Sequence, residues 1–122
     1  MKPDDMLASA EKLVDDEALG SATGRRAAAL LARQALETAV AHAVRPALPH
    51  EVSFTALLLA LRRLAADETQ GENAAYAWAA LSSATHIQGG SLALPREAVL
   101  DLIALVRRFV EAPPAGAVTR ER

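Results

Sequence analysis

Apolar residues recur at helical spacing along most of this 122-residue chain, and this pattern restricts its fold more than any other feature. Residues 53–66 follow the i, i+3, i+4, i+7 spacing of one helix face with Phe54, Leu57, Leu58, Leu61, Leu64 and Ala65. No segment shows the alternation that is typical of a strand. Because aromatic residues are only 3% of the chain, leucine, valine and alanine must build the core. We therefore predict an all-α protein in which alanines let helices approach closely.

Five helices are predicted from this periodicity and from the residues that begin and end helices. Their ranges are 3–19, 25–44, 53–66, 72–85 and 95–111. Pro3 and Pro95 suit the first turn of a helix, and Ser53 suits an N-cap. The glycine-containing segments 20–24 and 67–71 are predicted to be a turn and a solvated loop.

Length and composition indicate one domain, formed by residues 1–112 and followed by a flexible C-terminal tail, residues 113–122. The net charge of −2 provides no general basic field for nucleic acid or anionic lipid. Cysteine is absent, which excludes disulfides and thiolate metal sites. No apolar run approaches the roughly 18 residues of a membrane span, and the first residues lack a signal-peptide core. We expect a cytoplasmic bacterial protein with no membrane, metal or cofactor.

The second predicted helix, residues 25–44, carries an unusually wide apolar face. Two adjacent rows form it: Leu31, Ala35 and Ala39, and beside them Ala29, Ala32, Leu36, Val40 and Ala43. Such a face needs several neighbours, and four other helices leave one row hard to cover. The sequence therefore predicts a homodimer. On the polar side, Arg33 and Glu37 are spaced for an i, i+4 ion pair.

The candidate functional residues gather at the end of the fourth predicted helix. This helix holds the only tyrosine, Tyr76, and the only tryptophan, Trp78, and it ends near His86, before Gly89 and Gly90. Helix ends and the loops after them often carry functional side chains. His86 can cap the helix C-terminus, line a binding cleft or act in catalysis. Trp78 and Tyr76 can be core contacts, dimer contacts or platforms on which bases stack.

The order of these elements resembles the HEPN superfamily of small prokaryotic helical domains. The resemblance covers residues 7–110 and is carried by three stretches: GRRAAALLARQALETAVAHAV, the helix ending in LSSATHIQGG, and PREAVLDLIALVRRFV. It implies an antiparallel up-and-down bundle of four to five helices that is usually dimeric. Many HEPN proteins are metal-independent ribonucleases in toxin–antitoxin, phage-defence or CRISPR systems. Others are non-catalytic and bind nucleotides, RNA or partner proteins.

The catalytic signature of that family is an arginine, four to six further residues and a histidine. In such a pair the imidazole moves protons at the attacking 2′-oxygen, and the arginine stabilises charge on the phosphate. His86 matches the histidine by position, but Ala79, Ala80 and Leu81 occupy the positions of the arginine. A formal match, Arg45 to His50, lies in the proline-containing linker after the second predicted helix.

Two functions follow as hypotheses. The first is a non-catalytic HEPN-like interaction module, a homodimer in a bacterial toxin–antitoxin, phage-defence or stress-response system, with RNA, a nucleotide or a partner protein as ligand. The second is a metal-independent endoribonuclease in which His86 is the catalytic acid or base and Arg26 or Arg96 replaces the missing arginine in space. The candidate binding residues are Arg26, Arg96, Trp78 and Tyr76. A transcription-linked helical domain is a third alternative, which the net charge disfavours.

Overall fold

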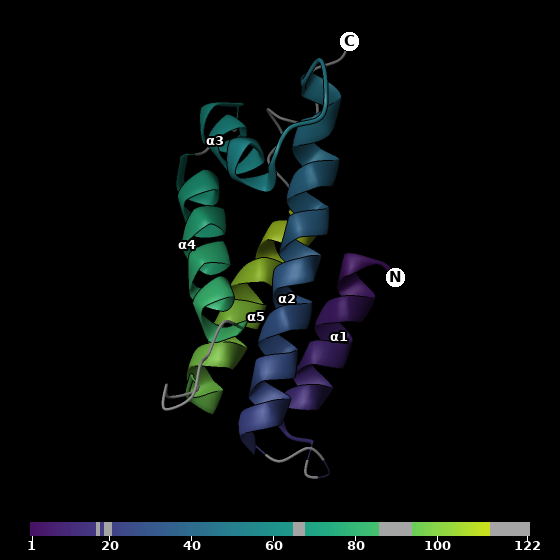
Figure 1. Cartoon of the computed structure of the whole chain (residues 1–122), viewed down its shortest axis with the longest axis vertical. Helices are drawn as coiled ribbons and strands as arrows, with labels where there is room; N and C mark the ends of the chain where they lie inside the picture. Colours follow the sequence, from purple (N-terminus) through teal and green to yellow (C-terminus); the bar gives the residue numbers. More distant parts are fainter. Residues whose placement is uncertain (17, 19–20, 65–67, 86–93, 113–122) are drawn as a thin grey trace.

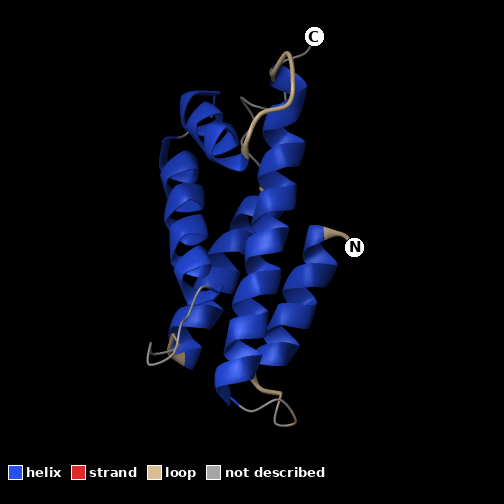
Figure 2. Ribbon diagram, viewed as in Figure 1, coloured by secondary structure: helices blue, strands red, loops and turns tan. Residues whose placement is uncertain are grey.

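The computed structural model describes residues 1–16, 18, 21–64, 68–85 and 94–112, and this part of the chain is a helical bundle without strands (Figures 1 and 2). Its helices are α1 (Pro3–Val14), α2 (Ser21–Val44), the 3₁₀ helix η1 (Arg45–Ala47), α3 (Phe54–Leu64), α4 (Glu68–Thr85) and α5 (Arg96–Glu111). The all-α fold predicted from the periodicity is confirmed. His86, Gly89, Gly90 and the predicted tail, residues 113–122, lie outside the described residues.

The four longer helices run alternately up and down the long axis of the molecule (Figure 1). In this view α1 and α4 run in one direction, and α2 and α5 run in the other. The shorter α3 lies at the end of the bundle where α2 ends, and it contacts α2 and α4. The arrangement is the antiparallel bundle that was predicted, with α3 added at one end.

The centre of the bundle is α2, which contacts α1, α3, α4 and α5. The two apolar rows predicted on this helix are covered by helices of the same chain. Ala29, Ala32, Ala35, Leu36, Val40 and Ala43 are buried, and Leu31 and Ala39 are partly buried against the core. Most of the face from which the sequence predicts a dimer is therefore buried within one chain, and Leu31 and Ala39 are the members of the two rows that keep some exposure.

Parts of the two segments that were predicted to be a turn and a loop are helical, and each contains a buried glycine. Residues 21–24 form the first turn of α2, and residues 68–71 form the first turn of α4, while α1 ends at Val14 rather than at residue 19. A Cβ atom on Gly24 would collide with the carbonyl oxygen of Leu13, and one on Gly71 would lie 2.9 Å from the Cα atom of Arg62. Close packing of α1 on α2 and of α3 on α4 therefore outweighs the weak helix propensity of glycine.

Helix starts follow the predicted signals more closely. Ser53 is the N-cap of α3, because its Oγ accepts a hydrogen bond from the backbone N–H of Ala56 at 3.2 Å. Pro95 is one position further out than predicted: it is the N-cap of α5 rather than its first helical residue. Its carbonyl oxygen accepts a hydrogen bond from the N–H of Val99.

We predict that Gly24→Ala destabilises the protein. Alanine favours an exposed helix by about 1 kcal/mol over glycine, whereas forcing a methyl group against the backbone of α1 costs about 1–3 kcal/mol. A net loss in the free energy of unfolding, measured by urea denaturation, is the expected result. The exposed neighbour Thr23→Ala is the control and should change that free energy by less than about 0.5 kcal/mol. A gain in stability for Gly24→Ala would mean that α1 and α2 do not approach this closely.

Candidate functional site: a groove between α4 and α5

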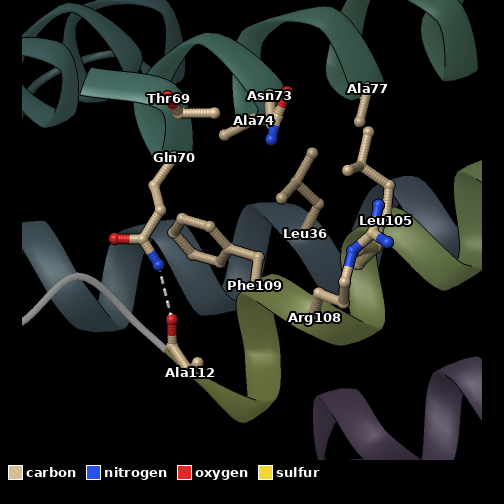
Figure 3. Close-up of a pocket in the computed structure, with 11 residues that line it drawn as sticks. Leu36, Thr69, Gln70, Asn73, Ala74, Ala77, Leu105, Arg108, Phe109 and Ala112 are labelled. Carbon is tan, nitrogen blue, oxygen red and sulfur yellow. Dashed lines mark hydrogen bonds between the residues drawn. The ribbon is translucent and has the colours of Figure 1, made fainter. Parts of the chain in front are cut away.

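A hollow of about 230 Å³ lies between α4 and α5, with Leu36 of α2 among its lining residues (Figure 3). The α4 residues that line it include the small Ala74 and Ala77. Phe109, Leu36 and the alanines of α4 make most of its wall apolar. The complete lining is Leu36, Thr69, Gln70, Asn73, Ala74, Ala77, Leu105, Val106, Arg108, Phe109 and Ala112.

A hydrogen bond closes one end of this hollow. Gln70, in the first turn of α4, donates from Nε2 to the carbonyl oxygen of Ala112 at 2.7 Å (dashed line in Figure 3). Ala112 follows the last residue of α5, where carbonyl oxygens have no partner within the helix. The bond therefore joins the start of α4 to the end of α5 and keeps the two helices in antiparallel register.

A second hollow adjoins the first along α5, and the two share Leu105 and Arg108. Its lining is Tyr76, Ala80, Leu94, Ala98, Asp101, Leu102, Leu105 and Arg108. We call the two hollows together the α4/α5 groove. At its edge, Tyr76 is 64% exposed, a large value for an aromatic side chain. An exposed aromatic ring beside an apolar groove is typical of a protein contact surface.

The charged residues of the groove have no partner within the described part of the chain. Asp101 and Arg108 are both exposed, and neither takes part in an ion pair there. Arg107, one residue away from Arg108, differs in this respect, because its Nη2 lies 3.1 Å from Oε2 of Glu11 in α1. Of the two arginines at the end of α5, Arg107 therefore contacts α1 and Arg108 lines the groove.

Trp78 lies on the opposite side of α4 from Tyr76 and is partly buried against the core. Its indole Nε1 donates to Oε2 of Glu37 in α2 at 2.9 Å. Its ring lies 5.4 Å from that of Phe54 in α3, between centroids, at an interplanar angle of 42°. Residues two positions apart on a helix point about 200° apart, which explains why these two aromatic residues face different neighbours.

Arg33 forms the other half of this polar cluster between α2 and α4. Its Nε lies 3.8 Å from Oε2 of Glu37, which is the ion pair predicted from the i, i+4 spacing. Its Nη1 also donates to Oγ1 of Thr85 at 3.1 Å, a contact that the sequence analysis missed. One sequence feature could have predicted that α4 contacts α2 here. Trp78 and Thr85 are seven residues apart, so they lie on one face of α4, and this face meets Glu37 and Arg33 of α2.

Arg96 makes a bidentate ion pair with Asp15, which links the start of α5 to the end of α1. Its Nε and Nη2 lie 2.7 and 2.9 Å from the two carboxylate oxygens. These hydrogen bonds hold the pKa of Asp15 below its ordinary value of 3.8. Arg96 is therefore engaged with α1.

Arg26 is exposed on α2, seven residues before Arg33 and so about 10 Å further along the helix. The structure does not bring the four predicted binding residues to one place. Only Tyr76 lies at the groove, and His86 lies outside the described residues.

The comparisons with known proteins add no relative: no protein-family model, curated protein or solved structure matches the chain. Within the described residues, no group of three or more metal-ligating side chains is placed to hold a metal ion. None of the helices described here is long and apolar enough to cross a membrane. The α4/α5 groove is thus the feature from which a function can be argued.

The Asp15–Arg96 pair makes a pH-dependent contribution to stability. Because the pKa of Asp15 is lower in the folded protein than in the unfolded chain, the pair stabilises the fold fully above about pH 5. This contribution is lost as the pH falls through the folded-state pKa. Asp15→Asn should therefore be less stable than the wild type at pH 7, and the gap in free energy of unfolding should narrow below about pH 4.

Urea denaturation from pH 7 to pH 2.5 measures that gap. The control is Glu72→Gln, which removes an exposed carboxylate that has no ion pair among the described residues. A constant gap between wild type and Asp15→Asn over the whole range would show that the carboxylate charge does not stabilise the fold.

Proposed function

We propose that this chain is a non-catalytic interaction module whose α4/α5 groove receives the apolar face of a partner helix. The observation that supports this best is the combination of an apolar groove with the exposed ring of Tyr76 at its edge. Grooves between two helices are a common seat for an amphipathic helix, which fills them with side chains from successive turns.

The dimensions of the groove favour a helix over a small ligand. Its two hollows share Leu105 and Arg108 and follow one another along α5, so the groove extends along the helices instead of closing around one compact cavity. Ala80 on one wall and Ala98 on the other are small, which allows a third helix to approach closely. Asp101 and Arg108 provide charges that a partner can meet without breaking any ion pair found among the described residues.

We further propose a HEPN-like role for this module in the bacterial cytoplasm, in toxin–antitoxin, phage-defence or stress-response pathways. The support is the resemblance carried by α2, the end of α4 and α5, together with the antiparallel order of the helices. The acidic balance of the chain and the groove favour a protein partner over RNA.

Site-specific photocrosslinking tests the groove. Tyr76→p-benzoylphenylalanine, irradiated in cells that express the chain, should give a discrete adduct, identified by mass spectrometry as a second copy or another protein. The same substitution at Leu30, a 38% exposed residue of α2 outside the groove, is the matched control and should give none of this adduct. Adding Ala80→Glu to the Tyr76 variant should reduce the adduct at least tenfold, because it places a charge in the groove. Equal adducts at positions 76 and 30, or none at 76, would contradict the proposal.

A metal-independent endoribonuclease remains the second candidate, and one contact favours it. Arg33 is hydrogen-bonded to Thr85, the residue directly before His86 in the sequence. In this function His86 is the acid or base, and Arg33, rather than Arg26 or Arg96, supplies the positive charge for the phosphate. Its binding to Glu37 and Thr85 holds the guanidinium at the end of α4.

RNA cleavage by purified protein separates the two candidates. For a non-catalytic module, the wild type and His86→Ala should give the same background cleavage of a single-stranded RNA in the presence of EDTA. Cleavage that is present in the wild type and falls at least a hundredfold in His86→Ala, with the circular dichroism spectrum unchanged, would establish the ribonuclease instead. Arg33→Lys is then the informative variant, since it keeps the charge but loses the planar fork of donors.

A further inference from the structure

We propose that the occupant of the α4/α5 groove face is a second copy of this chain, with the two α5 helices packed antiparallel around a two-fold axis near Ala104 and Leu105. This inference rests on the proposed function, since it names the partner for the same surface. It does not use the wide apolar face of α2, which the other helices of the chain cover.

The two charges of the groove complement each other in this arrangement. Asp101 and Arg108 are seven residues apart, so they lie on the same side of α5, about 10 Å from each other along its axis. In an antiparallel pair of α5 helices centred between residues 104 and 105, Asp101 of one copy faces Arg108 of the other. The two-fold axis repeats the contact, and the interface then contains two such ion pairs.

The same charges exclude the parallel alternative. Parallel α5 helices in register would place Asp101 beside Asp101 and Arg108 beside Arg108, and like charges in contact oppose association. Both side chains are exposed and have no ion-pair partner in the described part of the chain, so pairing across the axis breaks no internal contact. The negative and positive charges of one α5 therefore match the positive and negative charges of an antiparallel α5 in a second copy.

The apolar residues of this face support the same geometry. Leu105 lies between the two charges, and Ala98 and Ala112 lie near the ends of the same side of α5, with the exposed Ala104 beside it. Small residues permit the close approach of two helices, and Leu105 supplies apolar contact near the axis. Tyr76, at the edge of each groove, is placed on the flank of the face where it extends the buried area.

The size of the face sets the expected strength. A helix of 16 residues, such as α5, is about 24 Å long, and a helix is about 10 Å wide, so a face of two helices covers roughly 500 Å² per copy. The total of roughly 1,000 Å² is at the lower limit for a specific interface. A reversible dimer in the micromolar range is therefore expected, rather than an obligate one.

Charge reversal tests the pairing directly. Sedimentation equilibrium of the wild type from about 1 µM to 1 mM should show a monomer–dimer equilibrium. Asp101→Arg and Arg108→Asp each place like charges opposite one another twice, so each variant alone should dimerise at least tenfold more weakly. An equimolar mixture of the two variants restores both opposite-charge contacts, and it should form a heterodimer with an affinity near that of the wild type. Arg63→Asp, a charge reversal at an exposed position of α3 outside the groove, is the matched control and should leave the affinity unchanged.

Three results would overturn the inference: a wild type that stays monomeric at 1 mM, single variants that dimerise like the wild type, or weakened variants whose mixture does not recover. Circular dichroism reports whether each variant keeps its helices, so loss of dimerisation can be distinguished from loss of folding. A monomeric wild type that still gives a crosslink from position 76 to another protein would leave the proposed function intact. If neither the dimer nor the crosslink is observed, both the proposed function and the inference about the second copy are contradicted.

Discussion

The fold depends on the burial of α2 among the other helices. This helix contacts α1, α3, α4 and α5, and its buried face consists mainly of alanine, interrupted by a few larger residues such as Leu36 and Val40. Small side chains let several helices approach one axis, which is necessary in a core with few aromatic residues. Gly24 extends the same principle to the start of the helix, where even a methyl group would meet the backbone of α1. All of the buried side chains described in the bundle are apolar.

Because most of the inner face of α2 is buried within the chain, we propose the groove between α4 and α5 as the surface for a partner. One side of α4 packs against α2 and α3, and the other side borders the groove. Trp78 is held by Glu37 and Phe54 and fixes the helix against α2 and α3, while Tyr76 is exposed at the groove. The rotation of about 100° per residue separates the anchor from the contact residue by only two positions.

The polar contacts that join distant helices lie at the boundary of the core. Arg96 with Asp15, Arg107 with Glu11, and Gln70 with Ala112 tie α5 to α1 and α4. Exposed polar contacts of this kind add little stability individually. Asp101 and Arg108 have no such contact among the described residues, and in the dimer that we propose each pairs with the other across the two-fold axis.

The sequence by itself determined the features that depend on neighbours within one or two helical turns. The apolar periodicity predicts an all-α chain, Ser53 predicts the start of α3, and the spacing of Arg33 and Glu37 predicts their ion pair. Only the tertiary structure decided the helical state of Gly24 and Gly71, the contacts of Trp78 with Glu37 and of Arg33 with Thr85, and the groove beside Tyr76. Helical periodicity shows which residues share a face, but not which helix that face meets or in what register. Those choices arise from contacts between segments as much as 96 residues apart, as in Glu11 and Arg107, and no local pattern encodes them.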